Sequence, residues 1–263
     1  MLKDEEIEAI VNRIMQEVGQ RPAPPAPAVD DSGGYGGATA VDTATGNLGV
    51  YPTLDEAVAA AKSAFRRLQA LPLAIRAEMV AHMRQAAREH ALPLAEMAQR
   101  ETGMGRVEDK VLKNVLNANK EQGTEALQTG AWSGDGGLTI VEYAPYGLIG
   151  ALTPSTNPTS TVICNAIGMV AAGNAVVFNA HPSAKGASNR TVQILNEAIL
   201  QAGGPAGLLT CVAEPTIESA QALMAHRDIR LLTVTGGAAV VKAAMRSGKR
   251  AVCAGPGNPP VVV

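Results

Sequence analysis

The sequence is poor in aromatic side chains and in cysteine, and each shortage excludes a class of protein. Phe, Trp and Tyr make up 3% of the 263 residues, and Lys+Arg 22 against Asp+Glu 24 give a net charge of -2 without any basic block. Nucleic-acid binding needs a basic surface and stacking platforms, so we expect no nucleic-acid partner. The three cysteines (Cys164, Cys211, Cys253) are widely spaced in apolar runs, which predicts buried thiols in a reducing compartment and excludes a disulfide framework.

A leader sequence and long uninterrupted apolar runs are also missing. Residues 1–20 are charged throughout, and the most apolar segment, residues 162–178, is interrupted by Asn165, Gly168, Gly173 and Asn174. Neither a signal peptide nor a membrane span is therefore predicted, and we expect a cytoplasmic protein. With 46% hydrophobic residues, the chain has enough material to bury a sizeable core.

The first 40 residues differ from the remainder in composition. Residues 2–18 place apolar side chains at helical spacing opposite charged and polar ones, which predicts an amphipathic helix within residues 1–18. Residues 19–40 are rich in Pro and then in Gly, which predicts a flexible linker. The apolar face of such a helix must be buried, either on this chain or a second copy, or on another protein as a docking tag. The periodicity alone leaves both alternatives open.

Three helical stretches are predicted before residue 137. Thr53 and Glu56 form a capping-box pattern ahead of a helix at residues 54–71. A second helix is predicted at residues 73–91, ending before Pro93, and a third at residues 106–127. These stretches carry scattered charge without a cluster of metal-ligand residue types, so we assign them to the scaffold and predict no metal site.

Strands and helices alternate from residue 137 onward, which predicts an α/β fold. Helices on both faces of a parallel, Rossmann-like sheet are expected, because short apolar strands joined by helical crossovers build that architecture. The predicted strands are residues 138–143, 147–152, 175–178, 208–212, 229–234 and 250–253. The predicted helices between them are residues 158–172, 184–202, 217–226 and 238–246.

Two junctions between a predicted strand and the next helix are suited to binding a ligand. One is the loop at residues 153–158; the other is Thr235-Gly236-Gly237, where the glycines let a backbone approach closely at a helix start. Ligands of open parallel sheets bind at the carboxyl ends of the strands, so a nucleotide-type ligand is predicted there. The usual dinucleotide fingerprint G-x-G-x-x-G is absent from the sequence.

Five segments, in this order and at this spacing, resemble the aldehyde dehydrogenase superfamily: residues 147–154, Asn157-Pro158, residues 171–177, Thr235-Gly236-Gly237 and residues 255–262. Within it, TPSTNPTST, FNAHPSA and AGPGNPP resemble the CoA-acylating propionaldehyde and acetaldehyde dehydrogenases of bacterial microcompartments. The amphipathic helix and linker are similar to the encapsulation peptide of the propionaldehyde enzymes. This resemblance favours the docking-tag alternative and implies a microcompartment shell or cargo protein as partner, in the microcompartment lumen.

The resemblance implies a role for particular residues. Asn157 matches the asparagine whose amide, with a backbone N–H, stabilises the oxyanion formed when a cysteine attacks the aldehyde. An asparagine before Pro158 is also a favourable N-cap, and both roles are possible only if the cap leaves part of the amide available. The implied cofactor-binding residues are Thr153, Pro154 and Ser155 beside the nicotinamide, Asn179 and His181 at the adenosine ribose, Thr235, Gly236 and Gly237 at the pyrophosphate, and Gly255.

The implied cofactor is NAD, with coenzyme A as co-substrate and a short-chain aldehyde as substrate. Relatives that use NAD commonly hold the ribose through a lysine at the place that Asn179 and His181 occupy in this sequence. Because that lysine is replaced here, the choice between NAD and NADP stays open. Cys253 stands where hydrolytic members carry a glutamate that activates water. Without that base a thioester intermediate awaits a better nucleophile such as a thiol, which favours acyl transfer over hydrolysis.

The resemblance also implies an incomplete enzyme. The family's nucleophilic cysteine follows the region matched by residues 258–263, so residues 41–263 are expected to be the NAD-binding domain and the chain alone is expected to be inactive. The family further implies a homo-oligomer. The alternative from another class is a non-catalytic nucleotide-binding or microcompartment assembly protein, and a hydrolytic aldehyde dehydrogenase is a third, disfavoured by Cys253.

Overall fold

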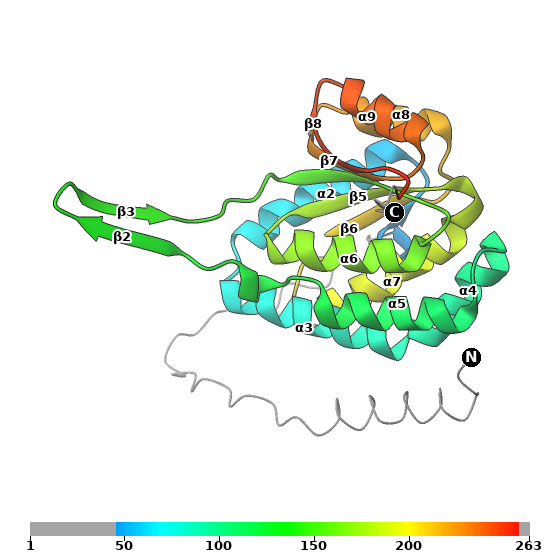
Figure 1. Ribbon diagram of the computed structural model, residues 1–263, viewed down its shortest axis with the longest axis horizontal. Helices are drawn as coiled ribbons and strands as arrows, with labels where there is room; N and C mark the ends of the chain where they lie inside the picture. The colour runs from blue at the N-terminus through cyan, green and yellow to red at the C-terminus, as the bar shows by residue number, and fades with distance from the viewer. Residues whose placement is uncertain (1–45, 258–263) are drawn as a thin grey trace, which may run out of the picture. The chain divides into compact units, whose positions relative to one another are not determined.

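A six-stranded parallel sheet lies at the centre of residues 46–257, the part of the chain that this computed structural model describes (Figure 1). Its order is β1-β6-β5-β4-β7-β8. The strands are β1 (Val50–Tyr51), β4 (Leu148–Thr153), β5 (Ala175–Ala180), β6 (Leu209–Val212), β7 (Ile229–Thr235) and β8 (Arg250–Ala254). β4, β5 and β6 are buried along their whole length, as expected for parallel strands covered on both faces. The predicted α/β fold class is confirmed.

Helices cover both faces of this sheet. α6 (Pro158–Ala171) and α7 (Lys185–Gln201) pack on one face, under an outer layer made by α3 (Leu73–Glu89), α4 (Ala91–Thr102) and α5 (Val107–Lys120) (Figure 1). α2 (Leu54–Gln69), α8 (Ile217–Ala225) and α9 (Ala238–Arg246) pack against the strands on the other. Short 3₁₀ turns are η1 (Gly46–Gly49), η2 (Thr124–Ala126) and η3 (Pro182–Ala184).

The predicted capping box is present at the start of α2. Thr53 Oγ1 accepts from Glu56 N at 3.3 Å, and the Glu56 carboxylate accepts from Thr53 N at 3.2 Å. These two bonds satisfy backbone donors that the first helical turn leaves unpaired. The helix therefore starts where the sequence predicts, and its buried residues, including Val58 and Leu68, join the core against the sheet.

The helix predictions before residue 137 are wrong at two points. The predicted helix at residues 106–127 is too long, because α5 ends at Lys120 and Glu121 adopts an extended backbone. The helix α4 is missing from the prediction, which treated Pro93 as a helix breaker. Pro93 is the third residue of α4, where the N–H that proline lacks would have had no partner within the helix.

The strand predicted at residues 138–143 does not belong to the parallel sheet. β3 (Gly137–Val141) pairs antiparallel with β2 (Gly130–Gly134) in a separate two-stranded hairpin that extends from the body (Figure 1). The two residues between Gly134 and Gly137 are Asp135-Gly136, a sequence typical of tight hairpin turns. Local pairing across this turn therefore replaces the predicted long-range pairing.

Some predictions fall outside the described residues. They are the amphipathic helix at residues 1–18, the linker at residues 19–40, and the last part of the family resemblance, at residues 258–263. Within residues 46–257, none of the helices combines the length and the apolar composition needed to span a bilayer.

Candidate functional site

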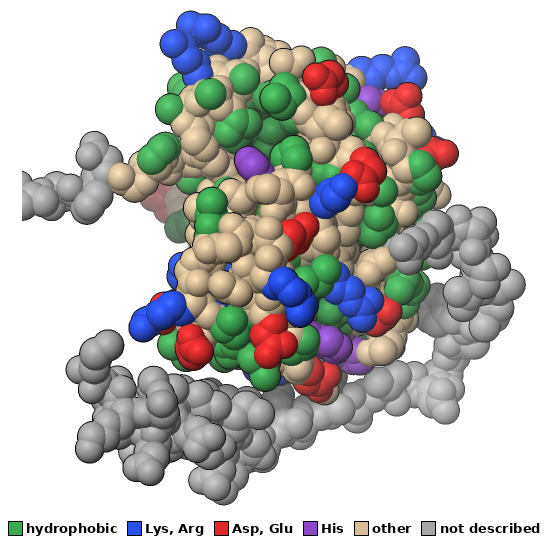
Figure 2. All heavy atoms as spheres, turned by 90° about the vertical axis from the view of Figure 1, so that its right-hand side faces the viewer, with side chains coloured by type: hydrophobic (Ala, Val, Ile, Leu, Met, Phe, Trp, Pro, Cys, Tyr) green, Lys and Arg blue, Asp and Glu red, His purple; other side chains and the backbone are tan. Residues whose placement is uncertain are grey.

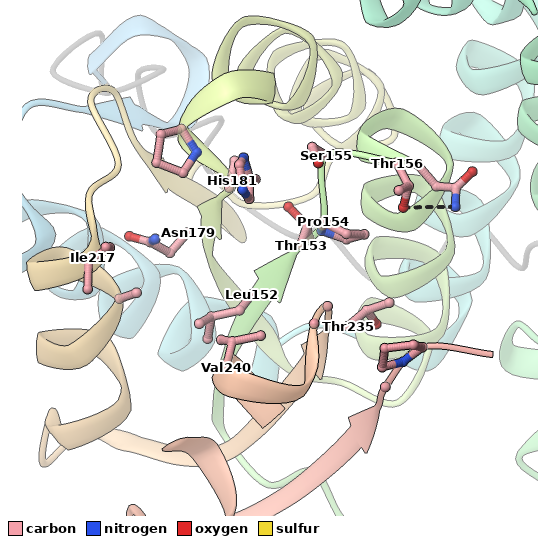
Figure 3. A pocket seen from close by; sticks show the side chains of 18 of the residues that line it. Leu152, Thr153, Pro154, Ser155, Thr156, Asn179, His181, Ile217, Thr235 and Val240 are labelled. Atoms are coloured by element: carbon pink, nitrogen blue, oxygen red, sulfur yellow. Dashed lines mark hydrogen bonds between the residues drawn. The ribbon is translucent and has the colours of Figure 1, made fainter. Parts of the chain in front are cut away.

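A cleft with a volume of about 760 Å³ opens at the carboxyl ends of β4, β5 and β7. The strand register sets these ends level, because Thr153 of β4 pairs with Ala180 of β5, and Leu152 pairs with Val234 of β7. The loops after all three strands therefore meet at one edge of the sheet. The cleft lies between them, with Ile217 and Asn179 at one end and Thr156 at the other (Figure 3).

All ten residues singled out from the sequence line this cleft. They come from four separate parts of the chain: Thr153, Pro154, Ser155 and Asn157; Asn179 and His181; Thr235, Gly236 and Gly237; and Gly255. The structure thus brings together residues that are about 100 positions apart along the sequence. Their individual roles remain predictions.

The turn between β7 and α9 leaves room for a ligand. A Cβ atom on Gly236 would lie 2.8 Å from Val240 Cγ1, so any larger residue here forces the Val240 side chain to shift. Gly237 forms the N-cap of α9 and supplies no side chain to cap the first-turn N–H groups. Such N–H groups and the positive end of the helix dipole suit an anionic group such as a pyrophosphate.

The hydroxyl of Thr153 is a second feature that fits a bound ligand. Thr153 is 5% exposed, lines the cleft, and its Oγ1 has no hydrogen-bond partner among the described residues. Buried hydroxyl groups in native proteins almost always have a partner. A polar ligand in the cleft would supply one, so the residues present fit a nucleotide cofactor.

Asn157 is the N-cap residue of α6 and precedes Pro158, as predicted, but its side chain makes no capping hydrogen bond. Its Oδ1 instead accepts from Lys113 Nζ at 3.0 Å, and its Nδ2 donates to Thr156 Oγ1 at 3.3 Å. Because lysine can only donate, this contact fixes the amide oxygen toward α5 and the amide nitrogen away from it. One of the two N–H bonds of Nδ2 is left for a ligand.

Two lysines of α5 hold the loop that carries Asn157, and the sequence analysis missed both. Lys110 is 6% exposed, and its Nζ donates to Thr156 O at 3.0 Å. Burial lowers the pKa of Lys110, with a further contribution from the nearby charge of Lys113. These residues were assigned to the scaffold because their contacts with the loop lie 44 and 46 positions away, beyond any local pattern.

The opposite end of the cleft combines an apolar slot with polar groups. Ile217 of α8 and Val240 of α9 both lie at the cleft (Figure 3), and Ala220 of α8 lines it as well. No sequence signal marked these three residues. Asn179 is 4% exposed, and its Oδ1 accepts from Ser219 Oγ at 2.6 Å. A flat apolar ring fits between two such helices, with polar substituents directed toward β5.

The three cysteines do not line the cleft. Burial, together with a hydrogen bond to Glu121, raises the pKa of Cys164 to about 12, and burial raises the pKa of Cys211 to about 12. Thiols of this kind are almost fully protonated at neutral pH and are poor nucleophiles. Cys253 is partly buried against the core. The prediction of buried thiols therefore holds fully for Cys211 and partly for the other two.

The sheet and its carboxyl-end cleft define a Rossmann-like α/β domain. The sequence profile of the Aldehyde dehydrogenase family matches residues 39–263, and the chain belongs to this family. The acetylating acetaldehyde dehydrogenase EutE of Escherichia coli (strain K12) is 52% identical over 217 residues, which are 82% of this chain and 46% of that protein. The resemblance to the CoA-acylating enzymes is thereby confirmed at the level of relatives.

Solved structures give the same assignment. A propionaldehyde dehydrogenase from the Clostridium phytofermentans fucose utilisation bacterial microcompartment is 50% identical with a TM-score of 0.79, covering 81% of this chain and 49% of that one. An engineered glycolyl-CoA reductase with bound NADP+ is 45% identical with a TM-score of 0.78, covering 81% and 48%. The chain spans about half the length of the curated relatives it matches.

Proposed function

We propose that this chain forms the dinucleotide-binding part of a CoA-acylating aldehyde dehydrogenase that converts acetaldehyde or propionaldehyde into the corresponding acyl-CoA. The observation that carries the proposal is the cleft, in which residues from four parts of the chain meet at the carboxyl edge of the sheet. The names of the relatives, an acetylating acetaldehyde dehydrogenase and a propionaldehyde dehydrogenase, support the substrate class. A nicotinamide dinucleotide in the cleft would supply the hydride acceptor.

The residues of the cleft would bind and orient the cofactor. The apolar slot formed by Ile217, Ala220 and Val240 receives the adenine ring, and the open first turn of α9 receives the pyrophosphate. The unpaired Thr153 hydroxyl would offer the cofactor a further hydrogen-bonding group. The fit of these groups follows from their chemistry and their order along the cleft.

Asn157 would stabilise the oxyanion at the other end of the cleft. The Lys113 ammonium holds the amide oxygen, so the amide nitrogen presents its donor away from α5. A donor held in place before the reaction needs no reorganisation when negative charge develops on the aldehyde oxygen. The protonated Cys164 and Cys211 thiols, which lie outside the cleft, are unsuited to attack the aldehyde.

Acyl transfer to CoA, in place of hydrolysis, is the proposed fate of the acyl group. Cys253 stands where hydrolytic relatives carry a glutamate, and its thiol cannot serve as that carboxylate base. A relative that acts on glycolyl-CoA supports the same chemistry. The acyl group therefore awaits a thiol nucleophile.

Titration of the 263-residue chain with NADH, followed by nicotinamide fluorescence, tests the proposal. We expect saturable binding, and we expect Gly236→Val to weaken it at least tenfold because the added side chain enters the turn beside Val240. Gly134→Val is the matched control, since a Cβ there meets nothing within 4 Å and the hairpin lies outside the cleft. Absence of binding by the folded chain would refute the proposed function.

We further propose that residues 1–18 direct the protein into a microcompartment lumen by docking onto a shell or cargo protein. The solved relative from a fucose utilisation microcompartment and the amphipathic pattern of residues 2–18 support this. Deletion of residues 1–18 should abolish co-purification with shell proteins while dinucleotide binding persists. Unchanged co-purification of the deletion variant would contradict the docking role.

A further inference from the structure

A second, smaller cleft lies at the opposite edge of the sheet, at the amino ends of β4 and β7. Its volume is about 250 Å³, and Leu148 at the start of β4 is one of the residues that line it. The second half of α2, the residues that lead into β4, and the start of β7 come together around it. None of the described residues lines both this cleft and the cleft at the carboxyl ends of the strands. The two clefts are therefore separate sites.

Positive charge predominates in this second cleft. The described residues that line it include three cations, Lys62, Arg66 and Arg230, and one carboxylate, Asp228. Lys62 Nζ donates to Asp228 Oδ1 at 2.9 Å, and this hydrogen bond lowers the pKa of Asp228, so these two charges are paired. Arg66 and Arg230 have no hydrogen-bond or ion-pair partner in the part of the chain that the structure describes. Two guanidinium groups are therefore left with unbalanced charge.

The surroundings of Tyr146, another residue of this lining, add to the positive charge. Arg250 Nη1 donates to Tyr146 Oη at 2.7 Å, which leaves the tyrosine O–H to donate to a ligand. The preceding carboxylate along the chain, Glu142, accepts from Thr129 and does not line the cleft. At the carboxyl ends of the strands, by contrast, Lys and Arg side chains lie among Asp and Glu side chains (Figure 2). The excess of positive charge is thus a local feature of a chain whose net charge is -2.

Gly147 leaves space between the lining residues. Its φ is +109°, a backbone conformation that favours glycine. A Cβ atom at this position would lie 3.9 Å from Arg230 Cγ and 3.9 Å from the Phe65 ring, both of which line the cleft. The missing side chain therefore gives a ligand access to a guanidinium group on one side and an aromatic wall on the other.

We infer that this cleft binds a phosphate dianion, either free or as the phosphate group of a small ester. Guanidinium groups present forked N–H donors that match phosphate oxygens, and the two unbalanced charges of Arg66 and Arg230 offset the charge of about -2 on a phosphate group. A carboxylate would offset only one of them. The volume of about 250 Å³, against about 760 Å³ for the dinucleotide cleft, leaves room for a short carbon skeleton beside Phe65.

Titration calorimetry of the 263-residue chain with inorganic phosphate and with glycerol 3-phosphate, in a phosphate-free buffer at one fixed salt concentration, tests this site. We expect saturable binding, and the probe with the lower Kd distinguishes a free anion from an ester. Arg66→Gln and Arg230→Gln should each raise the Kd at least tenfold, because each removes hydrogen bonds to a charged group. Both arginines are exposed and unpaired among the described residues, so both variants keep the fold.

Arg100→Gln is the matched control, because Arg100 is exposed on α4 and lines neither cleft. It should leave the Kd within about twofold of that of the natural chain. Gly236→Val separates this site from the dinucleotide cleft, where the open first turn of α9 also suits an anion. Phosphate binding that Gly236→Val abolishes, or that both arginine variants retain within about twofold, would overturn the inference. Absence of saturable binding of both probes by the folded chain would also overturn it, whereas the titration with NADH decides the proposed function separately.

Discussion

The hydrogen bonds of Asn114 provide the sharpest test of how the outer helices hold the cleft loop. Asn114 lies on α5 and is completely buried. Its Nδ2 donates to Ala91 O at 3.1 Å, and its Oδ1 accepts from Thr159 Oγ1 at 2.8 Å. The side chain therefore joins α5 to α4 and to the first turn of α6. The same helix carries Lys110 and Lys113, which contact the loop at residues 156–157.

Each single substitution leaves a buried group without its partner. Thr159→Val keeps the shape of the side chain but leaves Asn114 Oδ1 without a hydrogen-bond partner. It should lower the free energy of unfolding by about 1–2 kcal/mol. Asn114→Ala removes both bonds and opens a small cavity, so we expect a loss of about 2–4 kcal/mol. The double variant removes both members of the Asn114–Thr159 hydrogen bond, so neither is left buried without a partner. Its loss should therefore fall about 1 kcal/mol short of the sum of the single losses.

Urea unfolding followed by circular dichroism gives the four free energies of this cycle, provided that the m-values agree. Thr161→Val is the control, because Thr161 lies partly buried on α6, the helix of Thr159. Its hydroxyl makes no hydrogen bond to the part of the chain that the structure describes. A coupling energy below about 0.3 kcal/mol between Asn114 and Thr159 would show that the bond does not join α5 to α6, and would refute the reasoning.

Three further predictions concern stability, pH and association. Glu101→Ala should lower the free energy of unfolding by about 1–2 kcal/mol in urea titrations. The reason is that the Glu101 carboxylate accepts from two backbone N–H groups at the start of α7, both at 2.7 Å. Glu96→Ala is the control and should have little effect. The free energy of unfolding of the natural chain, relative to that of Lys110→Met, should rise with pH between the lowered pKa of Lys110 in the folded chain and its usual 10.5. In this range the unfolded chain still binds the proton that the folded chain has released. A difference in unfolding free energy that does not change with pH would contradict this. Leu138→Glu on the hairpin, where Leu138 is 66% exposed, should reduce self-association in sedimentation velocity, whereas Thr139→Glu on the opposite face of the strand should have less effect.

Local patterns predicted most of the sheet and its crossovers. Apolar runs of strand length alternated with helical segments from residue 147 to residue 253, and β4 to β8 and α6 to α9 lie at these segments, with ends that differ by at most two residues. The parallel pattern also predicted which loops would meet, because carboxyl ends of parallel strands share an edge. For this reason the ten residues that the pattern and the family resemblance indicated all line one cleft.

The errors arose where a contact depends on distant residues or on position within an element. Pro93 is compatible with α4 only because it falls in the first turn, and β3 pairs with β2 only because Asp135-Gly136 closes a hairpin. Helical periodicity assigned α5 to the scaffold, but it could not reveal that two of its lysines reach the cleft loop.

The sequence by itself determined the α/β class, the family and the identity of the loops at the cleft, because these follow from short-range periodicity and from motifs in a fixed order. Only the tertiary structure decided that the Asn157 side chain bonds to Lys113 and makes no capping bond to α6, and that Thr153 Oγ1 is left without a partner among the described residues. Each of these depends on which side chains from separate helices and strands come within hydrogen-bonding distance, and that is set by packing around the sheet.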